Sequence, residues 1–323
     1  MAQISKKNVS YIEENRLIGS KKIKWKTFKK NFPLTAMALP SVIFLFIFSY
    51  IPLYGLILPF KNYSYELGFF KSPWAGLENF RFLFDNEAVT IATRNTILYN
   101  LVFIVLGTIV AVVIALMLFE MSSRFVKGYQ TLLFLPYFIS WVVAAYAARV
   151  FLDMDYGLLN KLLSAFGKEP IAWYNAPRYW PAILIIAEIW KGMGYNGVIY
   201  YAALMGTDKS LFEAAKIDGA GKFKQIWYIS IPSIMPMIII MTILKVGKIF
   251  YGDFGLFYNF TLNSSLLYST TDIIDTYVYR ALITLGDIGM SSAAGFYQAV
   301  LGFILVVVTN LIVRKISPDN ALF

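Results

Sequence analysis

The chain has 323 residues, of which 58% are hydrophobic and 15% are charged, and it contains no cysteine and no histidine. Soluble domains carry about 25% charged residues, so this composition indicates an integral membrane protein. The missing residue types exclude disulfides, thiolate or imidazole metal sites, and catalytic triads that contain His or Cys. The net charge of +10 comes from basic residues that cluster beside apolar segments, which is typical of membrane topology signals and not of nucleic-acid binding.

Six segments are apolar and long enough to cross a bilayer, because about 20 apolar residues span ~30 Å of hydrocarbon. The predicted spans are residues 32–60, 95–119, 128–148, 179–206, 231–251 and 288–313. The 31 residues before them form a basic N-terminal arm. The sequence therefore predicts an all-α, polytopic membrane protein, with the arm at 1–31 and one transmembrane domain at 32–323.

The distribution of Lys and Arg predicts that both termini are cytoplasmic. In that orientation the cytoplasmic segments hold 17 Lys and Arg residues, nine of them in the arm, and the outer segments hold nine. The arm also has the charge to lie along the anionic lipid surface. The longest cytoplasmic loop between spans is then residues 207–230.

That loop predicts a short helix with its own end signals. Ser210 followed by Glu213 has the spacing of a capping box, and Gly219 can end the helix in a left-handed conformation. Leu211 and Phe212 give the helix an apolar side. Two interpretations follow with about equal weight: the helix docks into a groove of a partner, or it folds back onto its own domain.

The same loop carries a resemblance to a known family. Glu213, Ala214 and Ala215, followed by Gly219 and by residues 229–232, resemble the EAA signature of binding-protein-dependent ABC importer permeases. The motif departs from the family pattern in one place, because Ile occupies the position before the proline where Leu is commoner.

Further segments are similar to the MalF-like carbohydrate permeases, especially the subgroup for complex oligosaccharides. These segments are residues 76–80, 95–96, 190–191 and 275–280, and the resemblance runs from about residue 32 to the C-terminus. It implies a bacterial cell membrane, a second and distinct permease subunit, a cytoplasmic ABC ATPase dimer and an extracytoplasmic solute-binding protein. It also implies that one set of residues couples to the ATPase: Leu211, Phe212, Glu213, Ala214, Ala215, Asp218 and Gly219.

ATP binding by this chain itself is not expected. Gly-Lys pairs occur at 167–168, 221–222 and 247–248, but none is followed by Ser or Thr, as a phosphate-binding loop requires. The chain is therefore predicted to have no cofactor, no metal and no catalytic residue of its own. ATP and magnesium are expected in the partner ATPase.

Charged and aromatic residues at membrane depth are candidates for a substrate path between the fourth and fifth spans. The candidates are Trp190, Tyr195, Asn196, Lys245 and Lys248. Aromatic belts, core packing and lysines that reach toward an interface are competing explanations. If the two lysines face a cavity, they favour anionic oligosaccharides, because a carboxylate offsets their desolvation.

Glu188 and Lys191 lie three residues apart on one helical face. We predict a structural ion pair, with a direct ligand role as the alternative.

Two other classes of function compete with an importer subunit. A self-sufficient ion-coupled secondary transporter normally shows internal repeats and paired broken helices, and this sequence shows no repeat. A membrane-embedded enzyme would use clustered acids near an interface, and here Asp272 and Asp275 are close in sequence but adjoin a family-like segment. The leading prediction is therefore a permease subunit that moves an oligosaccharide, and the sequence does not name the sugar.

Overall fold

The computed structural model describes residues 25–316 and 318. These residues are helical, apart from turns, loops and a single β-bridge between Lys61 and Trp74. Most of the predicted basic arm therefore lies outside the described residues. The chain divides into two compact units, residues 1–57 and 58–323. The first contains α2 (Trp25–Leu45), which continues through a π-helical turn (Phe46–Tyr50) into a 3₁₀ segment (Ile51–Phe60).

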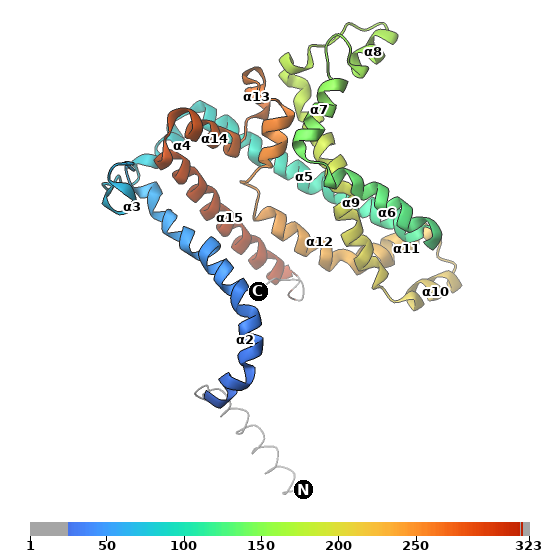
Figure 1. Ribbon diagram of the computed structural model, residues 1–323. Coiled ribbons are helices and arrows are strands. Elements are labelled where there is room, and N and C mark those ends of the chain that lie inside the picture. The colour runs from blue at the N-terminus through green and yellow to red at the C-terminus, as the bar shows by residue number, and fades with distance from the viewer. Residues whose placement is uncertain (1–24, 317, 319–323) are drawn as a thin grey trace. The chain divides into compact units, whose positions relative to one another are not determined.

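The second unit is built from long helices joined by short helical turns (Figure 1). Its longer helices are α5 (Glu87–Glu120), α6 (Ser123–Phe138), α7 (Trp141–Phe151), α9 (Trp180–Met205), α12 (Ile231–Val246), α14 (Ile274–Leu285) and α15 (Ile288–Ile316). Its shorter helices are α3 (Gly68–Lys71), α4 (Phe82–Asp85), α8 (Leu158–Ala165), α10 (Lys209–Ile217), α11 (Lys222–Gln225) and α13 (Tyr268–Thr271).

Five helical segments among the described residues are long and apolar enough to cross a membrane. They are Asn31–Phe60, Glu87–Glu120, Pro177–Met205, Lys222–Val246 and Ile288–Lys315. A sixth is present if the bent pair Arg124–Phe138 and Trp141–Phe151 is one span. This architecture confirms the predicted all-α, polytopic membrane protein. Two spans differ most from the prediction, since the second begins at Glu87 and the fifth begins at Lys222 and ends at Val246.

The third predicted span, 128–148, is not one straight helix. α6 ends at Phe138, α7 begins at Trp141, and the two helices meet at an angle of 93°. Pro136 in the last turn of α6 has no backbone N–H to donate, and the Ser140 hydroxyl accepts a hydrogen bond from the Val143 N–H as the N-cap of α7. A hydropathy window detects neither signal, because both depend on single residues.

Lys191 satisfies the backbone groups that this break leaves free. Its ammonium group donates to the carbonyl of Tyr137 at 3.1 Å and to the carbonyl of Ile139, and it lies 5.1 Å from the ring centroid of Trp141. The predicted ion pair between Lys191 and Glu188 is therefore wrong. Helical spacing placed both residues on one face of α9, but the unpaired carbonyls at the end of α6 are the partners that Lys191 binds.

Small residues let α9 approach its neighbours closely. Ala111 and Ala115 of α5 are fully buried, and a Cβ added at Gly197 of α9 would lie 2.8 Å from the Ile114 side chain. A Cβ at Gly194 would lie 1.9 Å from the backbone oxygen of Leu133 in α6. Such residues are typical of packed membrane helices, whose attraction depends on close backbone contact. They fix α9 between α5 and α6, and α9 carries most of the polar groups described below.

Two buried clusters secure the two ends of α9. Near its start, Trp180 and Leu184 pack against Phe257, Leu267 and Ile273. Near its end, a second cluster contains Ala111, Ala115, Tyr200, Leu204 and Ile234. α9 is thus anchored at both ends, and the polar groups in its middle have a rigid support.

Replacing Lys191 by Met tests its role at the break. The carbonyls of Tyr137 and Ile139 lose their donor at membrane depth, so we expect the variant to lose about 1–3 kcal/mol of stability. The matched control is Glu188→Gln, which leaves these hydrogen bonds intact and should change stability by less than about 0.5 kcal/mol. The measurement is thermal unfolding of the purified protein in detergent. Equal losses of stability in both variants would indicate that Glu188 and Lys191 form an ion pair, which would contradict the structure.

Candidate functional site

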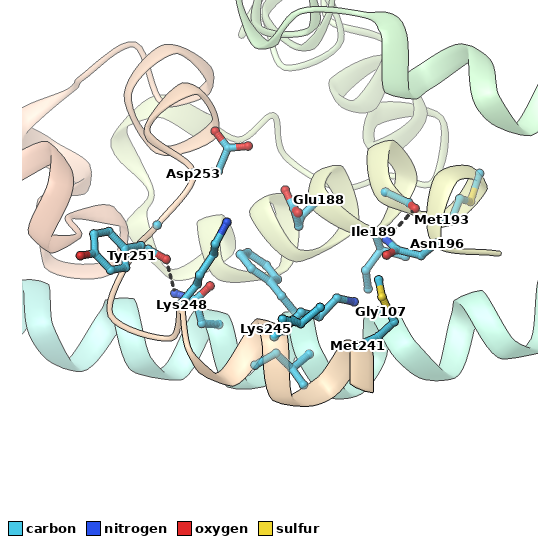
Figure 2. Close-up of a pocket in the computed structure, with 16 residues that line it drawn as sticks. Gly107, Glu188, Ile189, Met193, Asn196, Met241, Lys245, Lys248, Tyr251 and Asp253 are labelled. Carbon is cyan, nitrogen blue, oxygen red and sulfur yellow. Dashed lines mark hydrogen bonds between the residues drawn. The ribbon is translucent and has the colours of Figure 1, made fainter. Parts of the chain in front are cut away.

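A cavity of about 1030 Å³ lies between α5, α9, α12 and the turn that follows α12 (Figure 2). Two other cavities among the described residues have volumes of about 300 and 340 Å³. Its polar lining consists of Asn100, Glu188, Asn196, Lys245, Lys248, Tyr251 and Asp253. Its apolar lining includes Phe103, Ile104, Ile189, Met193, Met241 and Leu244.

Three of the five predicted path residues reach this cavity. Asn196, Lys245 and Lys248 line it, whereas Trp190 and Tyr195 do not. Tyr195 instead stacks on the ring of Tyr137, with centroids 4.7 Å apart and an interplanar angle of 9°. The helical period explains this division, since positions 188, 189, 192, 193 and 196 of α9 share one face and positions 190 and 195 lie off it.

The two lysines approach the cavity by different routes. α12 ends at Val246, and the backbone N–H of Lys248 donates to the carbonyl of Lys245 at 3.0 Å within the turn that follows. Lys248 therefore lies beyond the end of the helix that carries Lys245. Figure 2 shows both side chains, together with Glu188, at the space between α9 and α12. Lys245 is half-buried and Lys248 is exposed.

Two further polar residues, which the sequence did not single out, hold the wall of the cavity. The Asn100 amide donates to the carbonyls of Ile249 and Tyr251, at 3.0 and 2.9 Å, and ties the turn to α5. The Asp253 carboxylate accepts from the indole N–H of Trp141 at 2.5 Å and from the Leu256 N–H at 3.2 Å. Asn100 was detectable, since a polar side chain inside an apolar span needs partners. The contact of Asp253 was not detectable from the sequence, because its partner Trp141 lies 112 positions away.

The loop between α9 and α12 forms a helix whose start differs from the prediction. Asp208 is the N-cap of α10, and its carboxylate accepts from the Ser210 N–H at 2.9 Å. This hydrogen bond lowers the pKa of Asp208. The predicted capping box of Ser210 and Glu213 is therefore wrong, because Ser210 already lies within the first turn. Glu213 is left exposed, with no ion pair among the described residues.

The end of α10 agrees with the prediction. Gly219 has a φ of +75°, which is the left-handed conformation. The Ala220 N–H donates to the Ala215 carbonyl at 2.8 Å, and the Gly219 N–H donates to the Lys216 carbonyl at 3.1 Å. These are the two hydrogen bonds of a Schellman motif.

The two sides of α10 behave differently. Phe212 is buried, and its ring lies 5.4 Å from that of Phe119, near the end of α5. Lys222 pairs with Glu120 and makes a second connection to the same end of α5. Leu211 and Ile217 are 51% and 87% exposed. The helix therefore folds back onto its own domain through one side and leaves apolar side chains free on the other.

The acidic residues before α14 have structural partners. Asp272 is bound by Arg280 at 2.5 Å, and Arg280 lies 4.0 Å from the ring centroid of Tyr268. Asp275 accepts from the Gly252 N–H at 2.7 Å, and burial raises the pKa of its carboxyl. Both carboxylates thus bind elements of the fold to one another.

Comparison with protein families gives one match over most of the chain. Residues 99–318 match the family described as "Binding-protein-dependent transport system inner membrane component". Two similar proteins come from Bacillus subtilis (strain 168). Protein LplB is 32% identical over 306 residues, covering 94% of this chain and 96% of LplB. The polygalacturonan/rhamnogalacturonan transport system permease protein YteP is 33% identical over 288 residues, covering 89% of each chain.

A solved structure is similar over nearly its whole length. A chain of a bacterial alginate ABC transporter, in complex with an alginate pentasaccharide-bound periplasmic protein, has a TM-score of 0.83 and 31% sequence identity. The match covers 92% of this chain and 99% of that one.

Proposed function

Since the chain belongs to the family of binding-protein-dependent transport system inner membrane components, we propose that it forms half of the pathway of an ATP-driven importer for acidic oligosaccharides. It is a multi-pass membrane permease subunit. The observation that carries the substrate proposal is the large cavity, in which two lysines and two amide side chains lie beside aromatic rings.

The size and lining of the cavity suit a carbohydrate. Its volume of about 1030 Å³ is at the upper end of typical ligand pockets, which favours a chain of sugar units over a single one. Asn196 presents an amide oxygen, and Phe103 and Tyr251 present rings on which the C–H faces of sugars can pack. The combination of a few polar groups with apolar walls is typical of binding sites.

Two ammonium groups of the cavity are available to an anionic sugar. The cavity holds two carboxylates, Glu188 and Asp253, and two lysines, Lys245 and Lys248. Asp253 is held in the wall by two N–H hydrogen bonds, whereas the ammonium groups of both lysines make no hydrogen bond or ion pair with any described residue. A uronate carboxylate could therefore bind them through charge-assisted hydrogen bonds. Two of the similar proteins are named for polygalacturonan and alginate, whose sugar units carry carboxylates.

We further propose that α10 couples this subunit to a cytoplasmic ABC ATPase dimer, which supplies ATP and magnesium. Leu211 and Ile217 are exposed on the side of α10 that faces away from α5, and an apolar surface of this kind needs a groove. Phe212 attaches α10 to the end of α5, Lys222 at the start of α11 pairs with Glu120 at the same end, and α5 also lines the cavity. A displacement of α10 would therefore reach the cavity wall through a continuous helix.

The remaining partners follow from the same proposal. A second, distinct permease subunit completes the pathway, and an extracytoplasmic solute-binding protein delivers the sugar. Both termini are placed in the cytoplasm, because the positively charged segments then lie inside. In this orientation α10 is cytoplasmic and α8 lies outside.

The coupling role is tested by substitutions on the exposed side of α10. Leu211→Asp should abolish ATPase retention, and Glu213→Gln should weaken it if Glu213 pairs with a cation of the partner, because Glu213 has no capping role. Gly219→Val should lower retention because a β-branched residue in the left-handed region costs about 1–2 kcal/mol. The matched control is Gly221→Val, since Gly221 has an ordinary φ of −66° and open space around it.

The measurements are ATPase retention on the purified assembly and sugar uptake in cells. If Leu211→Asp and Gly219→Val behave like the Gly221→Val control in both assays, α10 is not a coupling element.

The substrate proposal is tested with Lys245→Met and Lys248→Met. Loss of one charge-assisted hydrogen bond, about 1.5–3 kcal/mol, should lower the uptake of a galacturonic acid trisaccharide about tenfold or more at low concentration. Uptake of a neutral galactose trisaccharide, where it is measurable, should change less than twofold. Equal losses for the acidic and the neutral sugar would contradict selection by charge.

A further inference from the structure

The residues that follow α12 form an irregular turn in the wall of the large cavity. Residues 247–253, here called the wall turn, contribute Lys248, Tyr251, Gly252 and Asp253 to the cavity lining. A turn has fewer internal hydrogen bonds than a helix, so its carbonyl groups need donors from elsewhere. The position of the Lys248 side chain therefore depends on the groups that hold the turn.

Amide side chains from two helices bind three consecutive carbonyls of the wall turn. The Asn100 amide of α5 donates to the carbonyls of Ile249 and Tyr251. The buried Gln298 amide of α15 donates to the carbonyl of Phe250, which lies between them in the chain, at 2.6 Å. The wall turn is thus attached to α5 and to α15 by side chains that are far from it in sequence.

Two further contacts leave the wall turn little room to move. The Asp275 carboxylate of α14 accepts from the Gly252 N–H at 2.7 Å. At the other end of the turn, a Cβ added at Gly302 of α15 would lie 2.7 Å from the backbone oxygen of Gly247. The backbone from which the Lys248 side chain extends is therefore fixed at both ends of the turn.

Lys248 and Glu188 reach the same cavity but form no ion pair with each other (Figure 2). Opposite charges attract more strongly in a protein cavity than in bulk water, so the two groups would approach each other unless the backbone kept them apart. Glu188 is the carboxylate available for such a pair, because both carboxylate oxygens of Asp253 already accept N–H groups. A pair with Glu188 would occupy the ammonium group that a sugar carboxylate needs.

We propose that Asn100 and Gln298 are positioning residues for the selection of acidic sugars. By holding the wall turn, they keep the Lys248 ammonium group apart from the Glu188 carboxylate and available to a uronate. This preorganisation favours binding, because the cation need not first leave a partner inside the protein. The inference rests on the proposed function for the identity of the sugar, whereas the placement of Lys248 needs no ligand.

The placement of Lys248 is tested by labelling the lysines of the native assembly, in nanodiscs, with a small water-soluble acetylating reagent. Mass spectrometry gives the rate at Lys248 relative to Lys168, an exposed lysine that does not line the cavity. Asn100→Leu should lower this relative rate about threefold or more, because a neighbouring carboxylate favours the charged, unreactive form of the amine. Adding Glu188→Gln should restore the rate of the parent.

Gln298→Leu tests the same placement from α15. It should behave like Asn100→Leu, and it carries the test if that variant does not assemble. The matched control is Asn160→Leu, because Asn160 is also a buried amide and donates to the Ile171 carbonyl at 2.9 Å and to two other carbonyls near α8. This control removes comparable hydrogen bonds outside the cavity and should leave the relative labelling rate of Lys248 unchanged.

The consequence for selection is measured as equilibrium binding of a galacturonic acid trisaccharide to the same assembly, without the solute-binding protein. Asn100→Leu should weaken binding about fivefold or more. Glu188→Gln should then regain affinity in that background by a larger factor than in the parent, because the two residues act on the same ammonium group. A folding defect would not be relieved by Glu188→Gln, so this comparison separates positioning from stability.

Two outcomes would overturn the proposal. The first is a relative labelling rate of Lys248 that is the same in Asn100→Leu, Gln298→Leu and the Asn160→Leu control. The second is a change of affinity on Glu188→Gln that has the same factor in the parent and in the Asn100→Leu background. A parent that binds no acidic sugar, although its lysines label as predicted, would contradict the proposed function and leave the placement of Lys248 supported.

Discussion

The structure depends on one constraint, which is that backbone groups at membrane depth need partners inside the protein. The break between α6 and α7 interrupts the helical hydrogen bonds. Lys191 supplies the missing donor by bonding to the carbonyls of Tyr137 and Ile139. The first residue of α7, Trp141, donates in turn to Asp253 in the wall of the large cavity. These three hydrogen bonds therefore permit a bent span and connect it to the cavity. A charged residue in the middle of α9 is explained by this structural need.

The number and type of the helices were predictable because hydrocarbon leaves few alternatives. A run of about 20 apolar residues must be helical to cross the bilayer, and five such runs are helices in the structure. The third run was predicted as one span and is a bent pair, because hydropathy sums composition over a window and cannot locate a turn. The helix-ending signals at Pro136 and Ser140 are single residues. The break between them is stable because Lys191 on another helix donates to the carbonyls that it leaves unpaired.

The candidate site was predictable to the extent that its residues lie close in sequence. Gly219 ends α10 as its type and position indicated, and Lys245 and Lys248 reach one cavity although α12 ends between them. The contacts that the sequence did not reveal join residues that are distant in the chain. Phe212 is buried because Phe119 lies beside it, and Glu188 lacks its predicted partner because Lys191 binds the end of α6. No local pattern contains that information.

In the proposed function, this permease subunit moves an acidic oligosaccharide with energy from a partner ATPase. The proposed function is tested most directly by purifying the assembly from native membranes and placing it in liposomes that maintain no ion gradient. We predict uptake of a galacturonic acid trisaccharide that requires ATP on the side of α10 and continues when ionophores are added. Uptake by this chain alone, without ATP and driven by a proton or sodium gradient, would contradict it.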